Sequence, residues 1–405
     1  MILFKECEVY GPEKLGRKDV LLAGGKIIAI EDKITISAAL RKTISVEVIS
    51  ADGLRMIPGL IDGHVHIAGA GGEGGPATRT PEMPLGKMID GGITTVIGCL
   101  GTDGITRSVE SVLMKAKGLR AEGVSAWIYT GAYQVPTPTI LGDVGKDVAL
   151  IDEVIGVGEI AISDHRSSGP TVDQLIHLVE HARVGGMLGG KAGIVNFHMG
   201  DAQNPFDILY RVVEKSELKF TQFLPTHCNR NDYIFEDAKD YGKNGYIDIT
   251  ASSYPYYPQY ENKPSKAVVE LVKSGVPLEH ITMTSDGCGS LPNFDDKGNL
   301  IKLDSGDPKS IFIALMDMVD KEKFPLEQAL KVVTSNVADI LKLNHKGRIA
   351  VGKDADVVLL DSENRVYHMV ANGDIMVRDA QRIKMGRMVT GKKSIVNQCS
   401  HFFCC

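Results

Sequence analysis

Hydrophobic and polar positions alternate differently in three parts of the chain. Residues 1–56 carry short β-patterned runs, and two of these, 19–23 and 26–30, flank Gly24-Gly25 as a hairpin would. From Pro58 to about residue 340, short apolar runs alternate with helical segments, and after about residue 345 short strand patterns return. The pattern predicts an α/β protein, with a (β/α)8 TIM-type barrel over 58–341 and a small β-sandwich domain formed by both chain ends, 1–57 and 342–405.

Within the predicted barrel, the clearest strands and helices can be named by position. Helices are predicted over 110–122 and 171–184. The predicted strands are 94–98, 125–129, 160–163, 193–197, 220–226, 245–249 and 281–284. Because the chemistry of such barrels lies at the C-terminal ends of the strands, the residues that follow each strand are the candidates for a functional site.

Two histidines end the apolar run that begins at Pro58, and they are separated by one residue. Side chains at i and i+2 point to the same face of a strand, so His64 and His66 can bind one metal ion together. Other predicted strands lead into His198, His227 and Asp286, while Glu159 stands before the run 160–163 as a candidate bridging carboxylate. Any one of these alone is more simply a hydrogen-bonded loop residue, but together they predict a two-metal site. Glu153 is the fallback bridge.

Six other histidines and two of the cysteines are predicted to be structural. Cys228 and Cys288 lie beside predicted ligands but fit small buried thiols better than ligands. The seven cysteines are scattered without zinc-finger spacing, which favours free thiols, and the Cys-rich C-terminal tail fits no known motif. The histidines assigned to structural positions are His177, His181, His280, His345, His368 and His401.

Composition narrows the possible partners. A net charge of −6 and a pI of about 6.0, without a basic cluster, argue against a nucleic-acid partner. No apolar run approaches the length of a membrane span, and the first residues show no secretory signal, so we expect no membrane partner and a cytoplasmic location.

Several longer motifs make the sequence resemble the amidohydrolase superfamily, and within it the isoaspartyl (β-aspartyl) dipeptidases. The segment 346–361 is similar to the superfamily's small-domain motif, and the resemblance covers nearly the whole chain to about residue 390. The narrower matches lie at 70–82, 100–103, 130–136, 161–166 and 225–231.

The resemblance implies a zinc-dependent dipeptidase that hydrolyses the isopeptide bond of β-L-aspartyl dipeptides by attack of a metal-bridging hydroxide. His64 and His66 would bind one of two Zn²⁺ ions per chain, or other divalent ions, and His198 and His227 would bind the second. Asp286 would ligate the first ion and shuttle the proton. Glu159 occupies the place where many relatives carry a carboxylated lysine. Relatives form large homo-oligomers, so an octamer is expected.

The resemblance also implies roles for residues that contact the substrate. Tyr133 would stabilise the oxyanion, and Glu73 would bind the substrate's α-amine. Arg166 and Arg230 would bind its carboxylates, because a planar guanidinium suits a carboxylate. The remaining hydrogen bonds would come from Ser290 and from the backbone of Gly71 and Thr102.

Two other functions remain open from the sequence. A cyclic-amide hydrolase of the hydantoinase or dihydroorotase type would share the metal ligands, but its cyclic substrate would offer no ammonium group for Glu73 to bind. A non-catalytic scaffold protein of the same fold would be expected to have lost metal ligands, whereas all six positions here carry competent ones.

Overall fold

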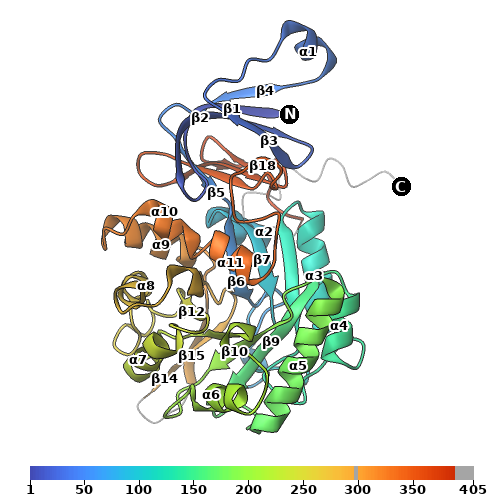
Figure 1. Ribbon diagram of the computed structural model, residues 1–405, viewed down its shortest axis with the longest axis vertical. Helices are drawn as coiled ribbons and strands as arrows, with labels where there is room; N and C mark the ends of the chain where they lie inside the picture. Colours follow the sequence, from blue (N-terminus) through green and yellow to red (C-terminus); the bar gives the residue numbers. More distant parts are fainter. Residues whose placement is uncertain (296–299, 388–405) are drawn as a thin grey trace.

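Eight parallel strands form the centre of the computed structural model, which describes residues 1–295 and 300–387 (Figure 1). The first six are hydrogen-bonded in chain order, and the last two pair with each other. Backbone contacts close the ring: the Cys228 amide donates to the Asp248 carbonyl, and Val65 bridges Gly287. The strands are β6 Leu60–Val65, β7 Ile93–Gly98, β8 Ser125–Thr130, β9 Val154–Ile162, β10 Ile194–Met199, β11 Phe223–Thr226, β12 Ile247–Thr250 and β13 Ile281–Thr284.

Helices follow these strands and cover the outside of the ring (Figure 1). A large apolar core fills the space between strands and helices, while a smaller one, with Tyr129 and Leu224, fills the inside of the ring. The helices are α2 Leu85–Asp90, α3 Val109–Ala121, α4 Val144–Leu150, α5 Val172–Gly189, α6 Asp207–Glu214, α7 Asp232–Tyr241, α8 Pro264–Lys273, α9 Ser310–Asp320, α10 Leu326–Lys331 and α11 Ser335–Ile340. The short 3-10 helices are η1 Pro76–Thr78, η2 Phe220–Gln222 and η3 Leu278–His280.

A second sheet joins the two ends of the chain above the barrel (Figure 1). Its nine strands are connected in one hydrogen-bonded sheet that branches at the first strand, which pairs with three others. The strands are β1 Ile2–Tyr10, β2 Lys14–Ala23, β3 Lys26–Glu31, β4 Glu47–Ser50, β5 Arg55–Pro58, β16 Val357–Leu360, β17 Val366–Ala371, β18 Asp374–Arg378 and β19 Gln381–Arg382. A helix, α1 Ala38–Thr43, and a hairpin on the barrel, β14 Ser290–Phe294 and β15 Leu300–Ser305, complete the elements.

The order of the elements determines which end of the barrel is open for chemistry. Strand β5 belongs to the nine-stranded sheet, and β6 begins two residues later, so this sheet covers the N-terminal ends of the barrel strands. Helix α11 packs against β6 and β13 and adds Val337 and Ala338 to the inner apolar core. The C-terminal strand ends therefore face away from the β domain (Figure 1).

The predicted fold is confirmed, and most predicted elements agree within one or two residues. Helix α5 extends to Gly189, five residues beyond the prediction, because its glycines serve packing instead of ending the helix. A Cβ on Gly185 would lie 2.6 Å from the Gly145 carbonyl oxygen, so only glycine allows α4 to approach this closely. The strand prediction over 220–226 was too long, since residues 220–222 form η2.

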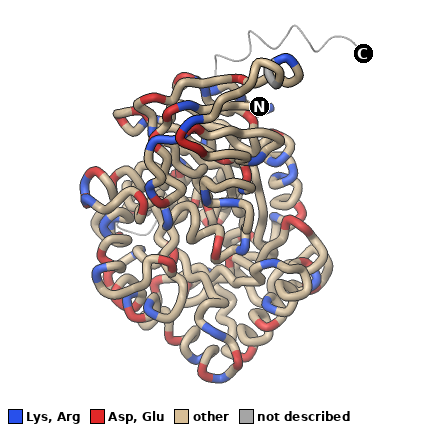
Figure 2. Tube along the Cα trace, turned by 45° about the horizontal axis from the view of Figure 1, so that its top comes forward, with Lys and Arg blue, Asp and Glu red and all other residues tan. Residues whose placement is uncertain are grey.

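Charged residues of both signs are interspersed over the described chain (Figure 2). In the ranges 1–295 and 300–387, no helix combines the length and the apolar character needed to cross a membrane.

A buried lysine links the last barrel segment to the nine-stranded sheet. The Lys346 ammonium lies 2.8 Å from Asp354, 2.6 Å from Asp356 and 3.0 Å from the Asn372 side-chain oxygen, and the residue is only 4% exposed. These partners belong to the segment before β16 and the turn after β17. The two carboxylates and the lysine therefore fix the C-terminal segment against the barrel.

We expect Lys346→Met to lower the free energy of unfolding by about 3–5 kcal/mol, because removal of one partner leaves buried carboxylates uncompensated. Urea denaturation followed by circular dichroism would measure the change. Lys243→Met is the matched control, since Lys243 and Asp240 form an exposed pair with side chains 47% and 79% accessible. Exposed pairs contribute about 0–1 kcal/mol. Equal effects of the two substitutions would show that the Lys346 network does not stabilise the fold.

Candidate metal centre

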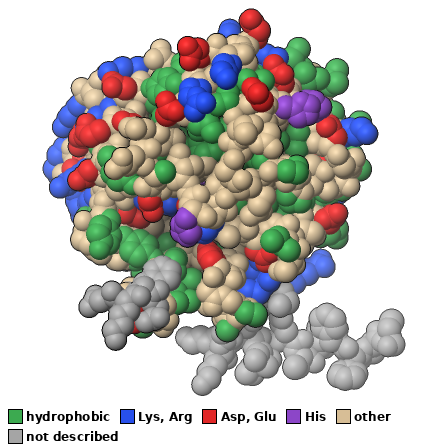
Figure 3. All heavy atoms as spheres, turned by 90° about the horizontal axis from the view of Figure 1, so that it is seen from below, with side chains coloured by type: hydrophobic (Ala, Val, Ile, Leu, Met, Phe, Trp, Pro, Cys, Tyr) green, Lys and Arg blue, Asp and Glu red, His purple; other side chains and the backbone are tan. Residues whose placement is uncertain are grey.

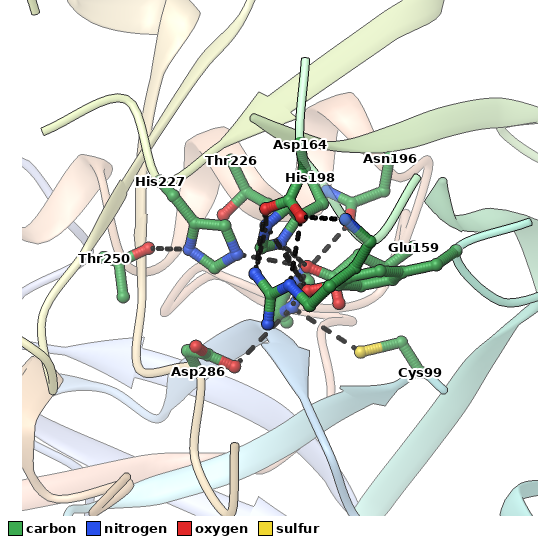
Figure 4. A network of polar contacts seen from close by, with 12 residues as sticks. Cys99, Glu159, Asp164, Asn196, His198, Thr226, His227, Thr250 and Asp286 are labelled. Atoms are coloured by element: carbon green, nitrogen blue, oxygen red, sulfur yellow. Dashed lines mark hydrogen bonds and ion pairs between the residues drawn. The ribbon is translucent and has the colours of Figure 1, made fainter. Parts of the chain in front are cut away.

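The six predicted metal-ligating side chains converge at the C-terminal ends of the barrel strands. Figure 4 shows four of them, Glu159, His198, His227 and Asp286. Glu159 lies at their centre and is buried. Its Oε2 atom is 2.9 Å from His198 Nδ1, 3.1 Å from His227 Nε2 and 3.3 Å from His64 Nε2. Asp286 Oδ1 is 3.0 Å from His66 Nε2. One carboxylate therefore stands between two pairs of histidines, as a bridge between two ions would.

The place of Glu159 on its strand differs from the prediction. Its strand was predicted to begin at residue 160, but β9 begins at Val154, so Glu159 lies near the C-terminal end of the strand and not before it. The apolar residues 154–157 had not been included in the predicted strand. This position agrees with the general rule that functional side chains of such barrels lie at the C-terminal strand ends.

Hydrogen bonds behind the histidines orient the nitrogens that face Glu159. His64 Nδ1 donates to the side-chain oxygen Oδ1 of Asn196 at 2.9 Å, and the Asn196 side-chain amide donates in turn to the Leu224 backbone carbonyl. His64 Nε2 is thus left with a free lone pair. His227 Nδ1 pairs with the Thr250 hydroxyl at 2.7 Å, which directs Nε2 to the centre. Such partners fix the tautomer of metal-binding histidines.

Burial and charge act in opposite directions on the pKa values of these groups. Burial alone would raise the pKa of Glu159, but the neighbouring His64 and His198 hold it well below its usual range. Burial would lower the pKa of His64, whereas Cys99 and Glu159 raise it well above its ordinary value. Burial lowers the pKa of His227 to about 3. The cluster is therefore a negative, water-poor centre that needs positive charge from protons or from a cation.

Two buried oxygens of this centre have no hydrogen-bond partner. They are Glu159 Oε1 and Asp286 Oδ1, and both point into the cluster. The backbone also leaves room, since a Cβ on Gly101 would lie 2.9 Å from the His66 ring and 3.5 Å from Glu159 Oε1. Unsatisfied buried carboxylate oxygens are costly unless a ligand occupies the site. Histidine nitrogens and carboxylate oxygens are also the donors that zinc and similar ions prefer, so the residues fit divalent cations.

Cys99 belongs to this cluster, although the sequence analysis assigned it no role. Its sulfur lies 3.6 Å from His64 Nε2 and 3.9 Å from His66 Nδ1 (Figure 4). Among the described residues, two buried groups could hold an ion. The first consists of His64, His66, Cys99 and Glu159, and the second consists of Glu159, His198 and His227. Cys99 follows β7 directly, so the search of strand ends that found the histidines would have found it as well.

A buried polar network beneath the cluster holds the strand ends in place. Asp62 on β6 accepts hydrogen bonds from the backbone amide and the hydroxyl of Ser285, and burial raises its pKa to about 7. Asp248 on β12 accepts 2.6 Å hydrogen bonds from three threonine hydroxyls, those of Thr226, Thr282 and Thr284. These contacts join β6, β11, β12 and β13, which carry or precede the metal-site residues. His227 and Asp286 have positive φ angles of 63° and 53°, a strained backbone typical of functional sites.

The residues predicted to contact substrate lie beside the cluster, on the side of Glu73. The Glu73 carboxylate accepts a 2.5 Å hydrogen bond from Ser290 and lies 3.5 Å from the Arg166 guanidinium. The Tyr133 hydroxyl is 2.7 Å from His198 Nδ1, and Arg166 lies over the Tyr133 ring. Burial raises the pKa of Tyr133 well above its ordinary value, which keeps the hydroxyl a donor.

Asp164 connects the arginines to the cluster, a role that the sequence analysis did not assign. It binds Arg166 through two hydrogen bonds of 3.0 and 2.9 Å, and it lies 3.0 Å from His198 Nε2. Arg230 is 3.8 Å from the same carboxylate. Burial alone would raise the pKa of Asp164, but His198 and Arg166 hold it well below its usual range. Asp164 therefore positions both arginines next to His198.

The loops around the opening complete the predicted substrate residues. Gly71 pairs with Arg79 in the loop that carries Glu73, and Thr102 follows Gly101, which touches the cluster. The roles assigned to Gly71 and Thr102 stay predictions. Seen from below, this end of the barrel shows acidic, basic and apolar side chains interspersed (Figure 3).

Glu153, the fallback bridge, and the described residues predicted to be structural lie outside the two ion-binding groups. Glu153 pairs with Lys117 and Arg120 just before β9, at the opposite end of the strand from Glu159. The Cys228 thiol donates to the Pro225 carbonyl, and the Cys288 thiol is buried. The remaining histidines have other surroundings: His177 stacks on His181, His280 pairs with the Gly242 carbonyl, the His345 carbonyl accepts from the Asp354 amide, and His368 stands in β17. His401 and the Cys-rich tail lie outside the described residues.

Comparison with known proteins shows which family this chain is similar to. Residues 215–389 match the model of the Amidohydrolase family. The crystal structure of a β-aspartyl dipeptidase from Fervidobacterium islandicum AW-1, in complex with β-Asp-Leu, is 42% identical and has a TM-score of 0.86, with 94% of this chain and 98% of that chain covered.

More distant similarities are to proteins with other names. An allantoinase from Enterococcus faecalis is 23% identical, with 92% of this chain and 88% of that protein covered. A dihydropyrimidinase structure from Brevibacillus agri NCHU1002 is 17% identical with a TM-score of 0.67, covers 95% of this chain and 96% of its own, and shares the fold alone. Identity of 42% along nearly the whole length decides the family: this chain is a hydrolase that belongs to the amidohydrolase family.

Proposed function

We propose that this protein is a metal-dependent dipeptidase that hydrolyses the isopeptide bond of β-L-aspartyl dipeptides. The observation that carries the proposal is the group of Glu73, Arg166 and Arg230 next to the metal centre. Arg166 and Arg230 both reach His198 Nε2, at 3.2 and 3.3 Å, and Glu73 contacts Arg166. Two basic side chains thus contact a predicted metal ligand directly, and the acidic side chain of Glu73 contacts one of them.

This pattern of charge complements an isoaspartyl dipeptide. Such a substrate carries one α-ammonium group and two α-carboxylates around a side-chain amide. The Glu73 carboxylate suits the ammonium, and the two guanidinium groups suit the carboxylates. The similar protein from Fervidobacterium islandicum binds β-Asp-Leu, which supports the same substrate class here. A cyclic amide such as allantoin or dihydrouracil offers no ammonium group, so it would leave Glu73 without a partner.

The residues of the centre have separate parts in the proposed reaction. We assign two divalent ions to the centre, with Zn²⁺ as the first candidate. One would be held by His64, His66 and Asp286, the other by His198 and His227, and Glu159 would be shared by both. Ions bound there would polarise the amide carbonyl and lower the pKa of a water molecule. The Tyr133 hydroxyl, beside His198, donates a hydrogen bond to the developing oxyanion. The Asp286 carboxylate accepts the proton of the attacking water and passes it to the departing amine.

Steady-state kinetics on four amides would test the substrate class. β-Asp-Leu should be hydrolysed far faster than α-Asp-Leu, dihydrouracil and allantoin, because it alone places an ammonium and two carboxylates around the scissile amide in this arrangement. Faster hydrolysis of either cyclic amide would overturn the dipeptidase proposal in favour of a hydantoinase-like activity. Absence of hydrolysis with all four, in a protein shown to contain metal, would support the scaffold alternative.

Because Glu159 supplies the shared carboxylate itself, we expect activity to be independent of bicarbonate. A lysine at this position would need CO2 to become a carboxylate, whereas glutamate needs none. Enzyme stripped of metal and kept free of CO2 should recover the same activity with Zn²⁺ whether or not bicarbonate is added. Elemental analysis should give about two ions per chain in both samples. Recovery only in the presence of bicarbonate would show that a carboxylated lysine is the bridging ligand.

A further inference from the structure

The Cys99 thiol is placed where a further protein ligand of the first metal position would be. It lies within 4.8 Å of the ligand atoms of His64, His66 and Glu159, and all four residues are buried. Cys99 stands directly after β7. Two residues further on is Gly101, where a Cβ would lie 2.9 Å from the His66 ring. Three chain segments therefore deliver two nitrogens, one oxygen and one sulfur to a single point.

The distances from the His64 nitrogen match the distances between neighbouring ligands of one ion. Zinc binds nitrogen and oxygen at about 2.0–2.2 Å and sulfur at about 2.3 Å, so its tetrahedral edges are about 3.4 Å for N–O and about 3.6 Å for N–S. The observed distances from His64 Nε2 are 3.3 Å to Glu159 Oε2 and 3.6 Å to Cys99 Sγ. His66 faces the same groups with two different ring atoms, since its Nε2 lies 3.8 Å from Glu159 Oε1 and its Nδ1 lies 3.9 Å from Cys99 Sγ.

A second observation points to a ligand at the same place. Glu159 Oε1, in a side chain that is 1% accessible, has no hydrogen-bond partner and faces His66. An unsatisfied carboxylate oxygen beside two imidazole groups and a thiol has the composition of a site for a thiophilic cation.

We propose that Cys99 binds the ion held by His64 and His66 as a thiolate, which makes this position selective for thiophilic divalent ions. The inference rests on the proposed metal site. On binding, the thiol releases its proton to solvent, the sulfur forms one coordinate bond, and no redox change occurs. Thiolate ligands favour zinc and similar soft or borderline ions, whereas sites with only oxygen and nitrogen accept manganese or magnesium more readily. Zn²⁺, Co²⁺ and Cd²⁺ should thus outcompete Mn²⁺ at this position.

The plain alternative is that Cys99 is a packing thiol. Its sulfur also lies 3.6 Å from the Val65 carbonyl oxygen, a distance that suits a weak hydrogen bond. Cys228 shows what such a thiol looks like, since it is buried, donates to the Pro225 carbonyl at 3.3 Å and belongs to neither ion-binding group. Cys228 is therefore the matched control.

Spectroscopy of the Co²⁺-loaded full-length protein would separate the two readings without any assay of activity. Wild type and Cys228→Ser should show intense near-ultraviolet sulfur-to-cobalt charge-transfer absorption, and Cys99→Ser should lack it. Cys99→Ser should also bind Cd²⁺ about 10–100-fold more weakly, the loss typical when support for a metal ligand is removed. Mn²⁺ affinity should change less.

X-ray absorption of the wild-type zinc protein keeps the test independent of whether Cys99→Ser folds. It should show a sulfur neighbour at about 2.3 Å from zinc. The inference is overturned if the wild type has neither a sulfur neighbour nor the charge-transfer band. Failure of the dipeptidase proposal would look different, because sulfur ligation would be present in a protein that leaves β-Asp-Leu intact.

Discussion

Asp286→Asn should lower kcat/KM for β-Asp-Leu by about two to four decades, the usual loss when a general acid–base group is removed. The carboxylate lies 3.0 Å from His66 Nε2 and 3.8 Å from His64 Nε2, and one of its oxygens has no hydrogen-bond partner. Burial alone would raise the pKa of Asp286, but His66 holds it below its usual range, so the group is ready to accept a proton. An amide has a similar shape and cannot accept that proton.

A substrate with a less basic leaving amine can distinguish loss of the proton shuttle from loss of metal in Asp286→Asn. A β-aspartyl p-nitroanilide releases a weakly basic arylamine that needs little protonation, so Asp286→Asn should impair its hydrolysis much less than that of β-Asp-Leu. Elemental analysis of the same preparations would show whether the ions remain bound. An equal loss for both substrates at full metal content would contradict the assignment of Asp286 as the proton donor to the leaving group.

The architecture could be predicted because barrel strands are buried on both faces and so give continuous apolar runs. Runs such as 94–98 and 281–284 match β7 and β13 closely. The strand over residues 154–162 was misjudged since its first half contains two glycines, which strands usually disfavour. The hairpin of β14 and β15 was not predicted, because exposed strands at a barrel opening alternate polar and apolar residues over too few positions to stand out from a loop.

The histidines and carboxylates of the centre could be predicted from their types and from the rule of strand ends. The parts that could not be predicted act through contacts between distant segments. Asn196 orients His64 across 132 positions of the sequence, and Asp164 holds Arg166 and meets His198 from a neighbouring strand. No local pattern marks an asparagine or aspartate for such a role. Cys99 was different, because its position directly after β7 was available, but the prediction took only histidines and carboxylates from the strand ends.

Glu73→Gln should lower kcat/KM for β-aspartyl dipeptides by about one to three decades while metal content stays unchanged. The Glu73 side chain is 18% accessible, and it contacts Ser290 and Arg166 rather than the metal ligands. Loss of one member of a desolvated charge pair with the substrate typically costs about 2–5 kcal/mol. The partial exposure of Glu73 places the expected loss toward the lower part of that range, since solvent screens the pair. Glu82→Gln is the matched control from the same loop, because its side chain is 63% accessible and pairs with Lys115.

The proposed contact between Glu73 and the substrate ammonium group can also be removed from the substrate side. N-acetyl-β-Asp-Leu lacks the ammonium group, so the wild type should hydrolyse it poorly and Glu73→Gln should lower that rate little further. Additive losses from the two changes would mean that Glu73 acts elsewhere, for example by holding Arg166 through their 3.5 Å contact. If the wild type hydrolyses the free and the acetylated dipeptide equally well, Glu73 does not bind the amine. The specificity of the site would then depend on Arg166 and Arg230 alone, and these select carboxylates in any acyl amino acid. The protein would be a broader amidase, in which the acidic loop has no part in choosing the substrate.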